Sequence, residues 1–410
     1  GLQQNGDMMA ERLGVRPVLR RIADLDIESD RGVTVAAEML TTDAAAVVDD
    51  PQVDVVVELI GGTGIARELV LKALAQGKAV VTANKKLLAE YGSEIYAMAE
   101  ANQADIYFGA SVGGGIPIIK ALREGLAANR VESIYGILNG TCNYILTCME
   151  TQGQAFDVAL KDAQELGFAE ADPSLDIDGF DTAHKAVILA SLAYGAPLSA
   201  DKVHVEGIRG LHKADLEYAL EFGYRIKLLA IIKRDGDQVE VRVHPTLVPL
   251  DSMLASVNGV FNAVMVDSDL AAETLYYGSG AGRLPTASTV LGDIADIARN
   301  QAKDASHRMS AVPRTGETLS VKPVSDVRTR YYLRLMPADK PGVLAQFTGI
   351  LGARGISIES VLQKGDSVDG HVPVVIITHE ALESDVDAAI QEIDALDAVL
   401  EGTVRLRIEV

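Results

Sequence analysis

A strand–helix–strand succession near the N-terminus is the feature that most constrains the fold of this chain. Residues 53–60 (VDVVVELI) form a near-continuous apolar run that stops at Gly61 and Gly62, which is typical of a strand buried on both faces. The pattern then predicts a helix over 66–76 and a second strand over 79–82. Alternation of this kind with short connections predicts a parallel, doubly wound α/β sheet.

An acid after an earlier strand indicates what this sheet binds. The apolar run 18–22 leads to Asp24, and in dinucleotide-binding folds an acid after the second strand meets the cofactor ribose. The helical pattern over 2–13 is then the end of the first helix, so we expect the first strand and its Gly-rich turn upstream of Gly1. An α/β domain complete from Gly1 is the alternative. Asp24 favours NAD over NADP, because a carboxylate repels a 2′-phosphate and no arginine directly follows it.

Beyond this dinucleotide-binding domain, predicted over residues 1–120, the chain divides into three segments. Residues 121–300 are richer in helix, with strands over 133–138 and 238–245, which predicts an antiparallel sheet covered by helices; we expect helix 283–300 to return to the first domain. Residues 301–327 are polar and contain two prolines, which predicts a linker. The tail, 328–410, has the order βαββαβ of a ferredoxin-like domain.

Charge and cysteine content narrow the classes of partner. The chain of 410 residues carries 37 Lys and Arg against 58 Asp and Glu, a net charge of −21. An acidic surface repels phosphate backbones and anionic lipid, so we expect neither nucleic-acid nor membrane binding. Two cysteines form no disulfide framework or zinc ribbon, and no apolar run is long enough to span a bilayer. The cysteine content predicts a cytoplasmic protein, and a local basic pocket for a small anion stays open.

The densest polar cluster, residues 167–185, is the first candidate for chemistry. Asp181 and Lys185 lie four residues apart in a predicted helix over 180–194, and therefore on one face of it. Carboxylates beside a lysine can hold a substrate ammonium group and tune the lysine for proton transfer. A solvated acidic loop with one surface ion pair is the alternative.

Three further features lie where ligands of such folds bind. Lys85 directly follows the strand 79–82, at the edge where parallel sheets bind ligands, unless it is merely exposed like Lys86. The glycines at 113–115 free backbone carbonyls that could ligate a cation, or form a flexible turn. The glycines at 278–282 precede a helical stretch and could bind a pyrophosphate.

In combination these segments closely resemble the homoserine dehydrogenases of the bacterial aspartate pathway. The resemblance rests on motifs in order along residues 1–300: VVELIGG (56–62), VTANK (81–85), GGGIPIIKALREGL (113–126), LNGTCNYIL (138–146), GFAEADPSLDIDGFDTAHK (167–185), RVHPTLVP (242–249) and YYGSGAG (276–282). It implies reversible hydride transfer between NAD(P)H and L-aspartate 4-semialdehyde, giving L-homoserine. The segment DKPGVLAQFTGILGARGISIES (339–360) resembles the amino-acid-binding ACT domain.

The resemblance also implies roles for individual residues. Lys185 matches the group that exchanges a proton with the alcohol oxygen, with Asp181 and Lys85 completing the catalytic set. The residues implied to bind substrate are Glu170, Asp176, Asp181, Lys85 and Thr141. Those implied to bind NAD or NADP are Asp24, Ile60, Gly61, Lys85, Gly167 and Gly282.

One departure from the family pattern concerns a monovalent cation, Na or K. The resemblance implies a glutamate and three backbone carbonyls as its ligands, but Gly109 stands in place of the glutamate. The carbonyls of Val112, Gly114 and Ile116 remain as candidate ligands.

The resemblance of the tail to ACT domains implies that an amino-acid effector regulates the protein. The turn at Asp339 and Gly342 opens a helix and matches the effector site of ACT domains, for which threonine is the expected effector and a homo-oligomer, dimer or tetramer, the expected assembly. A tail that only mediates oligomerisation is the alternative. For the whole chain, the rival to an enzyme is a non-catalytic amino-acid sensor, which the absent Gly-rich turn and Gly109 would favour.

Overall fold

The computed structural model describes residues 1–195, 198–313, 319–364 and 370–409. By internal packing the chain divides into two units. Unit 1 comprises residues 1–131, 184–202 and 266–318, and unit 2 comprises 132–183, 203–265 and 319–410. Within the described ranges, none of the helices has the length and apolar character needed to cross a membrane.

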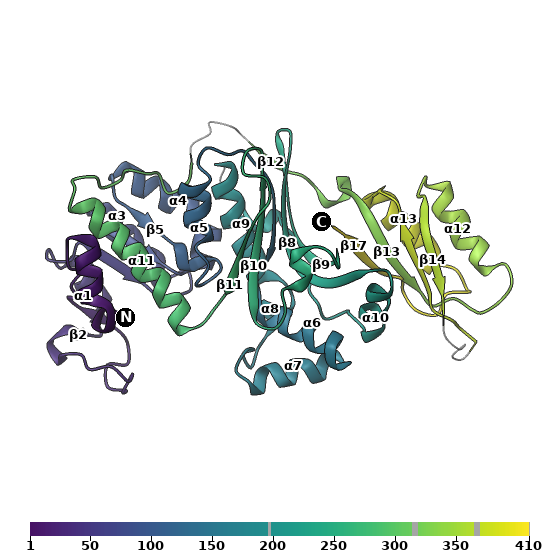
Figure 1. Cartoon of the computed structure of the whole chain (residues 1–410), viewed down its shortest axis with the longest axis horizontal. Coiled ribbons are helices and arrows are strands. Elements are labelled where there is room, and N and C mark those ends of the chain that lie inside the picture. The colour runs from purple at the N-terminus through teal and green to yellow at the C-terminus, as the bar shows by residue number, and fades with distance from the viewer. Residues whose placement is uncertain (196–197, 314–318, 365–369, 410) are drawn as a thin grey trace. The chain divides into compact units, whose positions relative to one another are not determined.

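Unit 1 contains the predicted parallel sheet (Figure 1). Strands β3 (Val55–Glu58), β4 (Ala79–Thr82) and β5 (Ile106–Tyr107) pair in that order, all parallel, and β1 (Ile22–Ala23) pairs in parallel with β2 (Leu40–Thr41). The helices between them are α1 (Leu2–Leu13), α2 (Ala44–Asp49), α3 (Ile65–Ala75) and α4 (Lys85–Ala101). All four residues of β4 are buried, as its unbroken apolar sequence predicts for a central strand. The predicted Rossmann-like α/β class is confirmed.

A helix from far along the chain completes the core of unit 1. Helix α11 (Arg283–Gln301) buries Val290 and Ile297 against Ala79, Val81 and Tyr107 of the parallel strands. Residues 18–33 contribute little to this core, since most of them are exposed.

Unit 2 is built on an antiparallel sheet covered by helices, as the sequence predicts. Strands β10 (Phe261–Ser268), β6 (Val131–Ile137), β8 (Tyr224–Asp235) and β9 (Gln238–Pro249) are neighbours in that order. Strands β8 and β9 form a long hairpin that pairs twelve residues of each, from Tyr224 opposite Pro249 to Asp235 opposite Gln238. The helices are α6 (Gly140–Gln152), α7 (Phe156–Glu165), α8 (Ser174–Ile177) and α10 (Lys213–Glu221), while α9 (Phe180–Tyr194) begins in unit 2 and continues into residues of unit 1.

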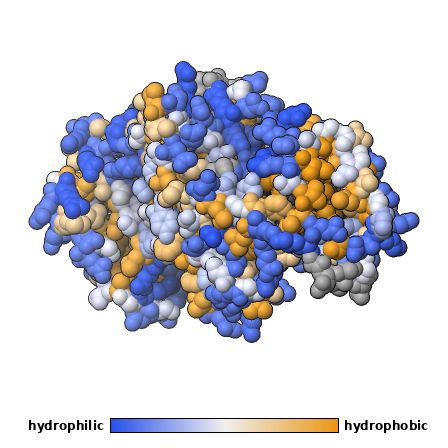
Figure 2. Space-filling view, turned by 45° about the vertical axis from the view of Figure 1, so that its right-hand side comes forward, coloured by the Kyte–Doolittle hydropathy of each residue, from blue (hydrophilic) through white to orange (hydrophobic). Residues whose placement is uncertain are grey.

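The C-terminal segment has the predicted ferredoxin-like order. Its elements are β13 (Arg328–Leu335), α12 (Val343–Ala353), β14 (Ile358–Gln363), β15 (Val374–Thr378), α13 (Glu383–Asp394) and β17 (Val404–Ile408), with a short β16 (Ala381–Leu382). The sheet order is β17-β13-β15-β14, so β14 is an edge strand. Leu344, Val361 and Leu400 of this segment are 39%, 42% and 54% exposed, and Figure 2 shows hydrophobic side chains gathered on part of the molecular surface.

This segment is continuous with the sheet of unit 2. Strand β17 pairs in parallel with β9, Arg407 opposite Thr246 and Ile408 opposite Leu247. Within the predicted linker 301–327, β12 (Ser320–Val321) also pairs with β9, while residues 314–318 lie outside the described part. The β8–β9 hairpin thus offers backbone hydrogen-bonding groups that both segments use, a tertiary match that local polarity and prolines do not reveal.

Buried ion pairs also join the C-terminal segment to α10 and β9 of unit 2. Asp215 of α10 is fully buried and accepts hydrogen bonds from Arg334 Nε (2.6 Å), Arg334 Nη2 (3.1 Å) and the Tyr332 hydroxyl (3.0 Å) of β13. Arg242 of β9 donates to Glu409 at 2.6 Å. Such pairs are costly to break from one side, because the remaining charge is left buried without a partner.

A buried lysine in β8 donates its hydrogen bonds to amide and carbonyl oxygens. Lys227 is 1% exposed, and its Nζ donates to Asn143 Oδ1 (3.1 Å), the Val257 carbonyl (2.5 Å) and Asn258 Oδ1 (3.2 Å). Burial, assisted by the positive charge of Arg225, lowers the pKa of Lys227 to about 7 from 10.5.

The stability of the protein relative to a Lys227→Met variant is therefore expected to rise with pH between about 7 and 10. In this window the unfolded chain binds one proton more than the folded chain, so the free energy of unfolding gains up to about 1.4 kcal/mol per pH unit. Thermal and denaturant unfolding of both proteins across this range measures the difference. The exposed Lys86→Met variant is the control, and a pH-independent difference for Lys227→Met would contradict the lowered pKa.

Candidate active site

In unit 1, a buried glutamate organises the turn after β3. Glu58 is 3% exposed, and its Oε1 accepts hydrogen bonds from the backbone N–H groups of Ile60 (2.7 Å) and Gly61 (2.9 Å). Gly61 has φ +81°, and a Cβ built there meets no atom within 4 Å. The two predicted cofactor residues therefore lie in a fixed turn with open space above it, at the carboxyl end of the strand.

The same glutamate connects this turn to the next strand. Thr82 at the end of β4 donates to Glu58 Oε2 at 2.6 Å and accepts from the N–H of Asn84 at 3.0 Å. The Asn84 amide donates to the Gly62 carbonyl (2.7 Å), and its oxygen caps α4 by accepting from Leu87 N–H (3.1 Å). Lys85 is the first residue of α4 and half-buried, whereas Lys86 is exposed.

The sequence prediction missed Glu58, Thr82 and Asn84, although it included Ile60, Gly61 and Lys85. The signal was present for Asn84, because an asparagine between a strand and a helical pattern is a typical N-cap. No local pattern indicates that Glu58 turns toward Thr82, since the contact joins residues 24 positions apart.

Asp24 lies in an exposed loop after β1, as predicted. Its Oδ1 accepts from the Asp26 N–H at 2.9 Å, and Arg31 Nη2 approaches its Oδ2 at 3.4 Å. The sequence prediction missed Arg31, because the loop brings this residue back to Asp24 from seven positions away. A carboxylate suits a ribose 2′-hydroxyl and a guanidinium suits a 2′-phosphate.

The two Gly-rich turns of unit 1 pack against one another. A Cβ at Gly114 would lie 2.5 Å from the Gly280 carbonyl oxygen, and the Gly115 N–H donates to the Ser279 carbonyl at 3.0 Å. Close backbone approach therefore accounts for glycine at 114 without a ligand. Gly282 has φ +121° and precedes the first residue of α11, so the predicted cofactor position coincides with the N-terminus of a 19-residue helix.

The predicted cation position has a different environment from the one the resemblance implies. The Gly109 N–H donates to Asp293 Oδ2 at 2.9 Å, and a Cβ at Gly109 would lie 2.9 Å from Asp293 Oδ1. The Gly114 carbonyl accepts from the Thr289 hydroxyl (2.7 Å) and the Ile116 carbonyl from the Ile118 N–H (2.8 Å). Burial raises the pKa of Asp293 to about 6, against the lowering effect of the Gly109 N–H.

These residues do not fit a cation held by a charged ligand at position 109. Two of the three candidate carbonyls already accept hydrogen bonds, and Asp293 and Thr289 occupy the space into which a side chain at 109 would project. Among the described residues, no group of three or more His, Cys, Asp or Glu is arranged to hold a metal ion.

In unit 2, an asparagine joins two of the predicted substrate acids. The Asn139 amide nitrogen donates to Asp176 Oδ1 at 2.7 Å and to Asp181 Oδ2 at 2.9 Å. The Asn139 oxygen accepts from the Cys142 N–H at 2.8 Å and so caps helix α6. The cap fixes the Asn139 side chain, which in turn contacts one carboxylate from α8 and one from the first turn of α9. Asn139 was missed by the sequence prediction despite its position as an N-cap in LNGTCNYIL.

The other predicted residues of unit 2 are Gly167 and Glu170, on the loop between α7 and α8, and Thr141, in helix α6. Thr141 Oγ1 donates to the Phe168 carbonyl at 2.7 Å, which ties the loop to α6. Gly167 has φ +74° with no atom within 4 Å of a Cβ position, and Glu170 is exposed. Thr141 is thus joined to the loop backbone, and Glu170 projects to solvent.

Lys185 follows Asp181 by one turn of α9, as the spacing predicts. Its side chain is 9% exposed, and that of Asp181 is 3% exposed. Burial of both groups argues against a solvated acidic loop with one surface ion pair, the alternative for this segment, because such a pair would be exposed.

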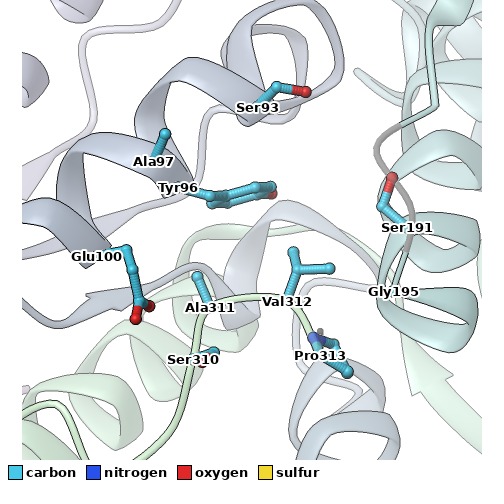
Figure 3. Close-up of a pocket in the computed structure, with 10 residues that line it drawn as sticks. All are labelled: Ser93, Tyr96, Ala97, Glu100, Ser191, Gly195, Ser310, Ala311, Val312 and Pro313. Carbon is cyan, nitrogen blue, oxygen red and sulfur yellow. The ribbon is translucent and has the colours of Figure 1, made fainter. Parts of the chain in front are cut away.

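A separate cavity of about 210 Å³ in unit 1 contains none of the predicted site residues (Figure 3). The Tyr96 ring lies across it, and burial raises the pKa of this tyrosine. Glu100 at its margin is paired with His307 at 3.2 Å. The remaining lining residues are Ser93, Ala97, Ser191, Gly195, Ser310, Ala311, Val312 and Pro313.

The predicted effector residues lie in an exposed turn of the C-terminal segment. The Asp339 N–H donates to the Gly370 carbonyl at 2.8 Å. Gly342 has φ +89° and caps α12, a left-handed conformation that favours glycine.

Comparison with known proteins bears on both units. A model of the homoserine dehydrogenase NAD-binding domain matches residues 3–109, the homoserine dehydrogenase model matches 117–295, and an ACT domain model matches 331–398. A homoserine dehydrogenase of Neisseria gonorrhoeae is 47% identical over 411 residues, covering 100% of this chain and 94% of the relative.

Solved structures agree with this similarity. The crystal structure of a homoserine dehydrogenase from Thiobacillus denitrificans superimposes with a TM-score of 0.93 at 48% identity, covering 100% of this chain and 94% of the other. A hyperthermophilic archaeal homoserine dehydrogenase in complex with NADPH matches 62% of this chain and 73% of its own, at 32% identity and a TM-score of 0.54. Because relatives match the whole chain at nearly half identity, this chain belongs to the homoserine dehydrogenase family, the NAD(P)-dependent oxidoreductases of amino-acid biosynthesis that the motifs predict.

Proposed function

We propose that Asp176 and Asp181 bind the substrate of this homoserine dehydrogenase and that Lys185 exchanges the proton of its alcohol. The observation that carries this proposal is the bridge from Asn139 to both carboxylates, at 2.7 and 2.9 Å. Two carboxylates kept together by one donor match the ammonium and hydroxyl groups of homoserine in charge and in hydrogen-bonding capacity. A lysine one helical turn beyond them suits the oxygen on which charge changes.

Each of these groups then has its own role in the reaction. In the direction of oxidation, Lys185 in its neutral form takes the hydroxyl proton of homoserine while the hydride leaves C4, which yields the aldehyde. The bound nicotinamide supplies the hydride acceptor. In the reverse direction the Lys185 ammonium returns the proton to the oxygen. Asp176 and Asp181 orient the substrate in both directions, and Lys85 contacts cofactor and substrate.

The cofactor is proposed to lie over the turn at Ile60 and Gly61, near Lys85, with the helix N-terminus at Gly282 and the loop at Gly167 also contributing. Support comes from the open, positive-φ glycine at 61 and from the backbone groups fixed by Glu58. With Asp24 and Arg31 side by side, we propose that the enzyme accepts both NAD and NADP. No step involves a monovalent cation, because Gly109 supplies no charged ligand.

An Asn139→Asp variant tests the substrate assignment. Aspartate retains the N-cap acceptor for α6 but replaces the donor between Asp176 and Asp181 with a third carboxylate. The KM for homoserine is expected to rise by about tenfold or more through lost orientation, with the KM for the cofactor unchanged. Steady-state kinetics with each substrate varied measures both constants. Asn102→Asp, at the end of α4, is the matched control, and a normal homoserine KM in Asn139→Asp would refute the role of the bridge.

For the ACT domain we propose amino-acid feedback, with threonine as effector, in a homo-oligomer in the cytoplasm. The exposed turn at Asp339 and Gly342 supports an effector site. The edge strand β14, with Val361 exposed on it and Leu344 exposed on α12, supports pairing of two ACT domains (Figure 2).

L-threonine is expected to inhibit homoserine oxidation, and Asp339→Ala is expected to raise the half-inhibitory concentration about tenfold, since a charge-assisted hydrogen bond to the effector is lost. The assay compares each variant with its own uninhibited rate, and sedimentation gives the oligomeric state. Arg354→Gln, in an exposed ion pair with Glu392 of the same domain, is the control. Equal inhibition of Asp339→Ala and the unaltered enzyme would remove Asp339 from the effector site.

A further inference from the structure

Two arginines of the last strand, Arg405 and Arg407, pair with Glu206 as well as with Glu383 of the C-terminal segment. Arg407 of β17, whose side chain is fully buried, donates to Glu206 Oε2 at 3.0 Å and to Oε1 at 2.9 Å. Arg405 on the same strand donates to Glu206 Oε1 at 3.0 Å. Glu206 directly follows β7 (His204–Val205), and its own N–H donates to the Val243 carbonyl of β9 at 2.7 Å. Both the side chain and the backbone of Glu206 are therefore fixed.

The residue after Glu206 contacts the short segment that joins the helices of the two proposed substrate acids. A Cβ at Gly207 would lie 2.3 Å from the Ile177 carbonyl oxygen and 2.5 Å from Asp178 Cα. The Ile208 N–H donates to the same Ile177 carbonyl at 2.8 Å. Contacts this close are possible only for glycine, so residue 207 lies against the backbone between Asp176 and Asp181.

Two further contacts join the same two segments of the chain. A Cβ at Gly179 would lie 2.9 Å from Val205 Cγ1, and Arg209 pairs with Asp178 through its Nε and, at 3.1 Å, its Nη2. Residues 205–209 therefore pack along residues 177–179. The flanking acids Asp176 and Asp181 are the two that Asn139 bridges.

We propose that Glu206 and Gly207 are positioning residues through which strand β17 of the ACT domain fixes the substrate-binding acids. The arginines hold Glu206, Glu206 holds Gly207 against Ile177 and Asp178, and that loop sets the separation of Asp176 and Asp181. The ACT domain thus serves homoserine affinity directly, in addition to any effector that it binds. This inference rests on the proposed role of Asp176 and Asp181.

The test compares Gly207→Ala with Gly210→Ala in the full-length enzyme. A methyl group at 207 must displace the backbone at 177–178, whereas a Cβ at Gly210 meets no atom within 4 Å. We expect the homoserine KM of Gly207→Ala to rise about tenfold or more while the cofactor KM stays unchanged, and Gly210→Ala to match the unaltered enzyme. Hydrogen exchange of residues 174–182 is expected to accelerate only in Gly207→Ala.

A second variant covers the case in which Gly207→Ala does not fold. Glu206→Gln keeps the shape of the side chain but removes its charge from Arg405 and Arg407, and a smaller rise in homoserine KM with faster exchange at 174–182 is expected. A folded Gly207→Ala or Glu206→Gln enzyme with normal homoserine KM and normal exchange overturns the proposal. Faster exchange at 174–182 with normal homoserine KM keeps the contact but removes Asp176 and Asp181 from the substrate site, which separates the two failures.

Discussion

Replacing Lys185 with alanine is expected to lower kcat for homoserine oxidation by about 10³-fold, within the range of general acid–base catalysis. Lys185 lies one turn beyond Asp181 on α9 and is almost buried, and the sequence of α9 contains no second lysine that could replace it. The loss is expected mainly in kcat, because the proton moves only in the reaction step, while the proposed substrate-binding residues Asp176 and Asp181 are unchanged.

Initial rates of NAD(P)H formation, with each cofactor and in both directions, measure this effect. The thermal unfolding temperature of the variant establishes that the fold is intact. Lys86→Ala is the matched control, because Lys86 is an exposed lysine next to the proposed cofactor contact Lys85. A Lys185→Ala enzyme that retains kcat within tenfold of the unaltered protein would assign the proton transfer to another group.

Replacing Asp215 with alanine is expected to cost about 3–5 kcal/mol in the free energy of unfolding. Asp215 is fully buried and accepts hydrogen bonds from Arg334, Tyr332 and the His212 N–H. Its removal leaves Arg334, which is 8% exposed, without its carboxylate partner. The contact between α10 and β13 then loses its buried ion pair and the hydrogen bond from Tyr332.

Urea unfolding followed by circular dichroism, together with calorimetry, measures the loss. Arg354→Gln breaks an exposed pair of the same domain and is expected to cost less than about 1 kcal/mol. The double variant Asp215→Leu with Arg334→Met is expected to recover most of the stability, because neither charge then remains unpaired. A cost below about 1 kcal/mol for Asp215→Ala would mean that water reaches Arg334.

Much of the fold could be predicted because local patterns agree with it. The run 79–82 is β4 without a residue of difference, and the helices predicted over 2–13 and 180–194 are α1 and α9. Where the structure differs from the prediction, a strand that is distant in the sequence determines the local structure. Residues 320–321 lie in a polar segment and still form strand β12, because β9 presents free backbone groups beside them.

The candidate site shows the same division. The sequence indicated Asp176, Asp181 and Lys185, since acids near a lysine at helical spacing are visible in one dimension. The sequence did not indicate Asn139, Glu58 or Glu206. Each of them contacts a residue 24 or more positions away along the chain, which only tertiary packing brings beside it.

The sequence by itself determined the α/β and ferredoxin-like patterns, the motifs of the family and the residue types for its chemistry. These follow from hydrophobic period, turn residues and side-chain chemistry, which are local properties. Only the tertiary structure decided that Asp293 lies beside Gly109, that Asn139 joins two acids, and that β17 continues the sheet of unit 2 and holds Glu206. Burial and long-range hydrogen bonds set these contacts, and they exist only after distant segments have packed together.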